Sequence, residues 1–117
     1  MKWGVILHEA FDAEFSAFPA AVHTALLAKA RLLEAFGPQT PRPHVDTLKG
    51  SKHTNMKELR FDAADGVWRA AFDPRRQAVI LVAGDKSGES QSRFYRWLIA
   101  TADKRFDDYL ARQKQGE

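Results

Sequence analysis

The sequence predicts an α+β fold: a curved antiparallel β-sheet, built from an N-terminal strand and a three-strand meander, with an N-terminal helix pair and a C-terminal helix. Two observations carry this prediction. The stretch from Leu48 to Lys86 holds three strand-like segments separated by the turn sequences DAADG and DPRR. The flanking segments, 11–36 and 93–113, instead repeat apolar residues at three- and four-residue steps, as amphipathic helices do.

The size and composition of the chain restrict its class. It has 117 residues, the size of one domain, so we expect a single domain over residues 1–117. There is no cysteine, which excludes disulfides and thiolate metal sites. The apolar run before His8 is too short for a signal peptide or a membrane span, so we expect a cytoplasmic protein without membrane association. A formal charge of +3 favours an anionic partner.

The N-terminal part is expected to be mostly helical. The segment WGVIL, residues 3–7, is β-branched and apolar and predicts a strand. A short helix over 11–18 and a long helix over 20–36 follow. The pair Gly37-Pro38 is a typical helix stop. Residues 37–47 contain three prolines and no periodicity, so we expect a loop there.

The meander strands have two distinct faces. In the segment 56–61 (MKELRF), alternation places Leu59 on the core side and turns Glu58 and Arg60 outward. In 67–73 (VWRAAFD), the same argument places Trp68, Ala70 and Phe72 on the core side and Arg69 and Ala71 on an open side. The third segment, 78–83, is nearly all apolar, as expected of a central strand covered on both faces. The serines before residue 93 can cap the final helix.

Cationic side chains gather around the meander. They are Lys49, Lys52, His53, Lys57, Arg60, Arg69, Lys86, Arg93 and Arg96. Such a surface would attract phosphates and follow a nucleic-acid backbone, and Tyr95 or His53 could stack on or hydrogen-bond to a base. The alternative is a solvated sheet face on which Glu58 simply pairs with Arg60 or Arg69 across strands.

Other chemistries lack their signatures. The four histidines lie far apart, with no short ligand spacing, so no metal site is expected. No glycine-rich phosphate loop precedes a helix, and no local Ser/His/Asp pattern is present. We therefore expect neither a metal nor another cofactor.

The order of the meander motifs resembles that of the RelE/HigB toxins of bacterial toxin–antitoxin modules, most closely the phage-derived HigB-like branch. In that branch a Leu-Lys-Gly leads into a Glu-Leu-Arg strand, then a Tyr-Arg-Val-like strand, then an apolar strand ending near Gly-x-Lys-Lys. The matching segments here are Leu48-Lys49-Gly50, Glu58-Leu59-Arg60, Trp68-Arg69-Ala70 and Val82-Ala83-Gly84-Asp85-Lys86. About half of the chain matches closely, and the remainder matches in the order of its elements.

The resemblance implies a RelE-like fold and a ribosome-dependent mRNA endonuclease (an mRNA interferase) that a cognate antitoxin, often a helix-turn-helix protein, neutralises. Members of the family cleave RNA without a metal, through attack of the ribose 2′-OH on the adjacent phosphate. The protein must activate that hydroxyl, stabilise a dianionic phosphorane and protonate the leaving 5′-oxygen.

The resemblance also suggests residue roles. Arg69 matches an arginine that contacts the scissile phosphate, and Lys86 a basic residue at the end of the third meander strand. Lys52, Lys57 and Arg60 lie in the region that supplies basic residues, while Glu58 and His53 both remain candidates for the general base. Many relatives place a tyrosine or histidine soon after the third strand; here Asp85 stands beside Lys86, and the nearest aromatic residues are Phe94 and Tyr95 at the start of the final helix. A non-nuclease relative, such as a gyrase-inhibiting ParE-like toxin, an inactive antitoxin-binding protein or a general nucleic-acid-binding module, is therefore the alternative.

Overall fold

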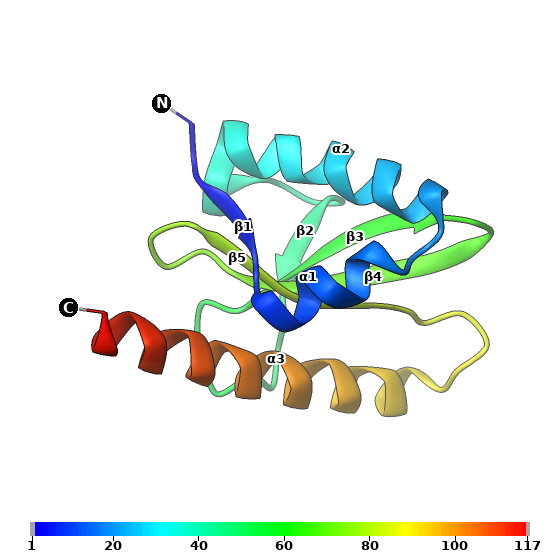
Figure 1. The fold of residues 1–117 in the computed structure, drawn as a ribbon. Coiled ribbons are helices and arrows are strands. Elements are labelled where there is room, and N and C mark those ends of the chain that lie inside the picture. Colours follow the sequence, from blue (N-terminus) through cyan, green and yellow to red (C-terminus); the bar gives the residue numbers. More distant parts are fainter. Residues whose placement is uncertain (1, 117) are drawn as a thin grey trace.

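The computed structural model describes residues 2–116 and confirms the α+β class (Figure 1). Its arrangement is compatible with the RelE-like fold that the resemblance implies. In chain order the elements are β1 (Val5–Leu7), α1 (Glu9–Ser16), α2 (Ala20–Phe36), the short 3₁₀ helix η1 (Gly37–Gln39), β2 (Val45–Thr47), β3 (Lys57–Ala63), β4 (Gly66–Asp73), β5 (Ala78–Asp85) and α3 (Gln91–Gln115).

The sheet has five strands in the order β1-β5-β4-β3-β2. The strand β1 runs parallel to β5, and the other neighbours are antiparallel. The hairpin between β3 and β4 turns at Ala64 and Asp65, whose φ angles of 50° and 61° suit the right-handed twist of the strands. The predicted meander is therefore present as β3, β4 and β5.

One prediction for this region was wrong. Residues 37–47 were expected to form a loop, but they contain η1 and the edge strand β2. The buried Val45 is opposite Leu59 on β3, and this pairing supplies the hydrogen bonds that a proline-flanked segment of three residues cannot supply itself. So short a strand leaves no alternation to recognise in the sequence.

Helices cover both faces of the sheet (Figure 1). On one face α1 and α2 pack against the side chains predicted to face the core, including Leu59, Phe61 and Phe72. On the other face α3 packs against Ala71, Leu81 and their neighbours. The face that was expected to be open is thus largely closed, because the apolar stripe of α3 lies across it: Ala71 is 0% exposed and Glu58 only 3%.

Local caps explain where the helices begin and end. The ring of His8 accepts a hydrogen bond from the Ala10 N–H (3.0 Å), so α1 begins two residues earlier than periodicity alone suggests. Ser90 caps α3 by accepting from the Arg93 N–H (3.2 Å), as expected of this serine-rich segment. Gly37 ends α2 with a φ of 58°, a conformation that favours glycine.

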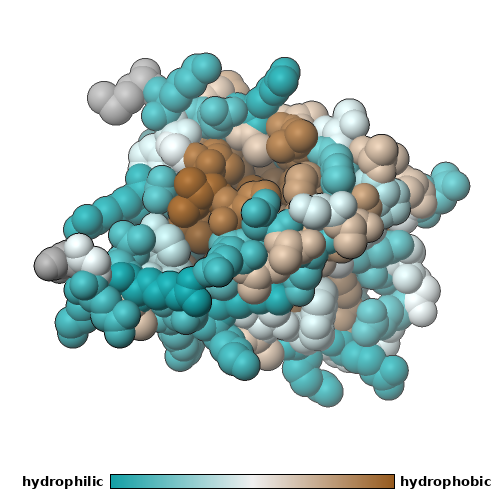
Figure 2. All heavy atoms as spheres, viewed as in Figure 1, coloured by the Kyte–Doolittle hydropathy of each residue, from teal (hydrophilic) through white to brown (hydrophobic). Residues whose placement is uncertain are grey.

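Apolar side chains also reach the surface. Figure 2 shows hydrophobic atoms gathered around β1 and beneath α2, and the large apolar residues exposed near these elements are Ile6, Leu27 and Phe36. Across residues 2–116, none of the helices combines the length and apolar character needed to cross a membrane.

Candidate nucleic-acid interface

A buried carboxylate lies at the centre of the basic region. Glu58 on β3 accepts hydrogen bonds at Oε1 from Arg60 Nε (2.7 Å) and from the Tyr95 hydroxyl (3.1 Å). Arg69 Nε lies 3.7 Å from the same oxygen. Arg60 and Arg69 are direct cross-strand partners on β3 and β4, and Tyr95 comes from the first turns of α3. We call these four residues the Glu58 cluster.

Two members of the Glu58 cluster, Arg60 and Tyr95, have raised pKa values. The hydrogen bond to Glu58 raises the pKa of Arg60. Burial, followed by the charge of Glu58, raises the pKa of Tyr95, so its phenol is neutral at pH 7 and acts as a donor. The Arg69 side chain is 12% exposed and gives one hydrogen bond to the Trp68 carbonyl (2.9 Å). In the described part of the chain its buried Nε–H has no hydrogen-bond partner, which leaves a free donor 3.7 Å from the Glu58 carboxylate.

Lys86 lies at the rim of the Glu58 cluster. Its ammonium is 6.0 Å from the centroid of the Tyr95 ring, within the range of a cation–π contact. The neighbouring Asp85 carboxylate turns to the chain instead, accepting from the N–H groups of Val67 (3.0 Å) and Ser87 (2.9 Å). Burial raises the pKa of Asp85, but the hydrogen bond from the Ser87 hydroxyl, together with the two N–H bonds, outweighs it and lowers that pKa. Asp85 therefore shapes the end of the β4–β5 ladder.

A groove beside the Glu58 cluster contains residues that sequence reasoning missed. Arg60 and Arg69 help to line a hollow of about 500 Å³ together with Lys29 of α2 and His44 of the loop before β2. Lys29 Nζ donates a hydrogen bond to His44 Nδ1 (2.8 Å). The pairing of β2 with β3 ends at Leu59, and the His44 carbonyl still accepts a hydrogen bond from the Arg60 N–H (2.8 Å), which holds His44 against the edge of β3. No sequence pattern links a helix residue and a loop residue of this kind.

His53 lies away from the Glu58 cluster. Its Nε2–H donates to Asp107 on α3 (2.9 Å), and Lys52 forms an ion pair with the same carboxylate. Asp107 follows Tyr95 by twelve residues, which is about 18 Å along a helix. His53 and Lys52 thus fasten the loop before β3 to the C-terminal half of α3.

The remaining cations are dispersed. Lys57 is opposite Phe72, which places it on the α1–α2 face, away from the Glu58 cluster. Lys49, Arg93 and Arg96 are exposed. Of the eleven predicted site residues, the structure brings five together: Glu58, Arg60, Arg69, Lys86 and Tyr95.

Comparisons of the sequence with known proteins show the family of this chain. The model of the phage-derived Gp49-like proteins matches residues 13–107. Two proteins of Mycobacterium tuberculosis are similar: "Putative toxin HigB2" is 42% identical over 90 residues, 74% of this chain and 44% of that protein. "Putative toxin HigB3" is 44% identical over 85 residues, 73% of this chain and 74% of that protein.

The matches cover different shares of the two relatives. The chain spans less than half of the first relative and about three-quarters of the second. No solved structure matches this chain. The family model covers most of the chain, including the segments that carry the Glu58 cluster. This chain therefore belongs to the phage-derived Gp49-like family.

Proposed function

We propose that this protein is the toxin of a type II toxin–antitoxin module and cleaves mRNA on the ribosome, in the cytoplasm. The names of its two relatives support the role of toxin. The observation that supports a nuclease is the Glu58 cluster: a carboxylate hydrogen-bonded to one guanidinium group and a neutral phenol, with a second guanidinium group 3.7 Å away, beside a groove with further cationic groups.

The proposed reaction uses side chains alone. Glu58 accepts the proton of a ribose 2′-OH, whose oxygen forms a bond to the adjacent phosphorus as the bond to the 5′-oxygen breaks. Arg60 and Arg69 stabilise the negative charge that develops on the phosphorane. Lys86 protonates the leaving oxygen, so the products carry a 2′,3′-cyclic phosphate and a 5′-hydroxyl.

Unused hydrogen-bonding groups on Glu58 and Arg69 support these roles. All hydrogen bonds that Glu58 makes with residues 2–116 use Oε1, which leaves Oε2 as the oxygen to accept a proton. The buried Nε–H of Arg69 has no partner within residues 2–116, so it can turn to the phosphorane without the loss of an existing bond once the substrate reaches the cluster. Tyr95 holds the carboxylate in place and remains protonated because its pKa is raised.

The test is induction in bacteria followed by mapping of mRNA 5′ ends. Wild type should arrest growth and produce new ends within translated codons, and Lys86→Gln should reduce their number by about 100-fold or more if the lysine is the general acid. The matched control is Lys104→Gln, the same change at an exposed lysine of α3. Growth arrest without new mRNA ends would reject the nuclease.

One observation favours a second candidate function, a binding protein without nuclease activity. Much of the positive charge in the Glu58 cluster is already neutralised, since Glu58 faces both arginines and Arg60 also pairs with Asp46 (3.5 Å). A gyrase-directed toxin would cause DNA damage and intact mRNA in the same induction experiment. Binding of RNA without cleavage would identify a nucleic-acid-binding relative, and the steepness of its salt dependence would count the phosphates contacted.

The partner in this proposal is an antitoxin encoded next to the toxin. The exposed apolar residues Ile6, Leu27 and Phe36 are candidates for its contact surface. Co-expression with the product of the neighbouring reading frame should restore growth and yield a complex that co-purifies. If the neighbour is inert, the proposal of a two-gene module is wrong.

A further inference from the structure

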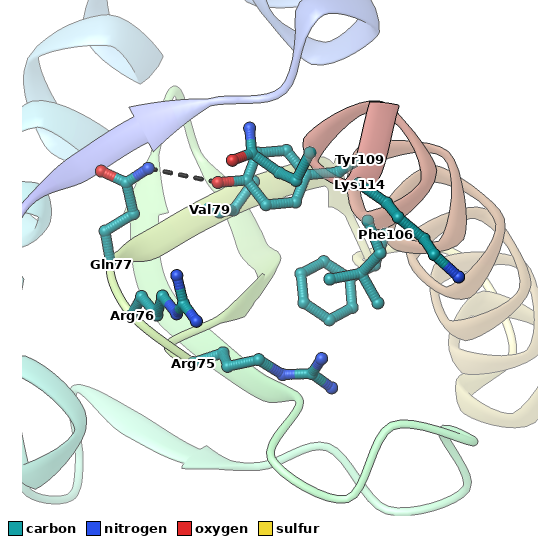
Figure 3. A pocket seen from close by; sticks show the side chains of 9 residues that line it. Arg75, Arg76, Gln77, Val79, Phe106, Tyr109 and Lys114 are labelled. Carbon is teal, nitrogen blue, oxygen red and sulfur yellow. Dashed lines mark hydrogen bonds between the residues drawn. The ribbon is translucent and has the colours of Figure 1, made fainter. Parts of the chain in front are cut away.

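A second hollow lies between the β4–β5 turn and the C-terminal half of α3, with a volume of about 210 Å³ (Figure 3). The residues that line it are Arg75, Arg76, Gln77, Val79, Phe106, Tyr109, Leu110, Gln113 and Lys114. Tyr109 follows Tyr95 by fourteen residues, about 21 Å along α3. The hollow is therefore separate from the Glu58 cluster, and we call it the α3 pocket.

The α3 pocket has an apolar floor and a cationic rim. Val79 and Phe106 are 2% and 1% exposed and form the floor. The rings of Phe106 and Tyr109 stack with centroids 5.9 Å apart and planes inclined by 11°. The nine lining residues include three cations, which are exposed at the rim, and no acid: Arg75, Arg76 and Lys114.

The polar groups of the α3 pocket are held in position. Arg75 lies with its guanidinium carbon 5.4 Å from the centroid of Phe106. The buried Asp73 fixes the turn that carries Arg75, because Asp73 Oδ1 accepts the Arg75 N–H (3.0 Å). Gln77 donates to the Tyr109 hydroxyl (3.2 Å), the bond drawn in Figure 3. Within residues 2–116 that phenol makes no other hydrogen bond, so its own proton remains available to a ligand.

We propose that the α3 pocket binds a nucleotide, with the base against the partly exposed ring of Tyr109, above the floor that Phe106 forms, and the phosphate between Arg76 and Lys114. The volume of the pocket, 210 Å³, lies below the ~300 Å³ of the smallest pockets for drug-sized ligands. The pocket therefore has room for the base, and the phosphate stays outside at the rim. The guanidinium of Arg75 already covers Phe106 (5.4 Å from the ring centroid), so it meets the edge of the base as a hydrogen-bond donor. The nucleotide is either free or part of an unpaired RNA strand.

This inference does not depend on the proposed nuclease activity, and its test avoids cleavage. The probes are AMP, inorganic phosphate and a single-stranded DNA decamer, which lacks the 2′-OH. The double variant Arg76→Gln/Lys114→Gln removes the two rim charges. Its matched control, Arg31→Gln/Lys104→Gln, makes the same changes at two exposed residues outside the pocket.

Titration calorimetry and the NMR signals of the aromatic rings report binding. AMP should shift the ring signals of Phe106 and Tyr109 and bind at least about fivefold more tightly than inorganic phosphate, because base stacking adds to the phosphate contact. The double variant should weaken AMP at least tenfold, while the control retains wild-type affinity. For the decamer, losing the one phosphate held between the two cations should reduce the slope of log K against log salt concentration by about 0.7.

The two sources of nucleotide give different outcomes. If AMP binds as tightly as the decamer, the ligand is a free nucleotide; if only the decamer binds tightly and shifts the rings, it is a strand. Equal binding of probes to the double variant and the control would overturn the proposal. So would inorganic phosphate that binds as tightly as AMP, or aromatic signals that no probe moves.

Discussion

Replacing Glu58 by glutamine separates the structural and catalytic roles of the Glu58 cluster. The substitution preserves the shape of the side chain and one acceptor oxygen, but removes the charge that faces Arg60 and Arg69. Glu89→Gln is the matched control, since Glu89 is exposed. Both variants should fold, because neither creates a cavity.

The expected destabilisation follows from exposure. The Arg60 side chain is 37% exposed, so water can replace much of the interaction that it loses with the Glu58 carboxylate. The free energy of unfolding should fall by about 1 kcal/mol from this loss. Arg69 is 12% exposed and loses a charged neighbour in a drier site, which adds about 1 kcal/mol more. The sum is roughly 2 kcal/mol. With an unfolding entropy of about 2.1 cal/mol/K per residue, Tm should fall by about 8 °C.

The assay combines thermal unfolding by circular dichroism with the mapping of mRNA ends at 25 °C, where both variants are folded. Glu58→Gln should lower Tm by about 8 °C and reduce cleavage by about 100-fold or more, whereas Glu89→Gln should change neither. An unchanged Tm would refute the network itself. A lowered Tm with undiminished cleavage would show that Glu58 holds the arginines without acting as the base.

Three further predictions concern single side chains. Tyr95→Phe removes one hydrogen bond to Glu58 and should cost about 1 kcal/mol in urea unfolding; a stabilised variant would contradict this contact. Phe72→Ala empties a site that is 0% exposed and should cost about 3–5 kcal/mol in the same assay; a loss below 1 kcal/mol would mean that the core rearranges. Burial raises the pKa of Asp73 above its usual 3.8, although the Arg75 N–H opposes it. As pH falls, the folded state therefore binds this proton before the unfolded state does. The free energy of unfolding of wild type should rise relative to that of Asp73→Asn as pH falls from above the raised pKa towards 3.8. Urea unfolding at pH 7 and pH 4 measures this difference, and a fall in its place would contradict the prediction.

Strand alternation predicted the two faces of β3 correctly, because a period of two is a property of the extended backbone. Leu59 does pack beneath α2, and Glu58 and Arg60 do share the opposite face. Alternation cannot predict what covers a face. Glu58 was expected to point to solvent and is buried, since the docking of α3 depends on contacts between residues far apart in sequence. The strand β2 was missed for a similar reason: its partner strand, β3, stabilises it.

The length of α3 explains why the predicted site divides in two. Tyr95 near its start contacts Glu58, whereas Asp107 holds His53 and Lys52 about 18 Å further along the helix. His53 and Glu58 are only five residues apart in sequence, but Met56 between them is buried against α3, and the two side chains contact different turns of that helix. Cations of one sequence cluster therefore reach different parts of the same helix. Because the two sites lie on different turns of α3, substitutions in the α3 pocket should leave the hydrogen bonds of the Glu58 cluster intact, and the two sites can be tested separately in one chain.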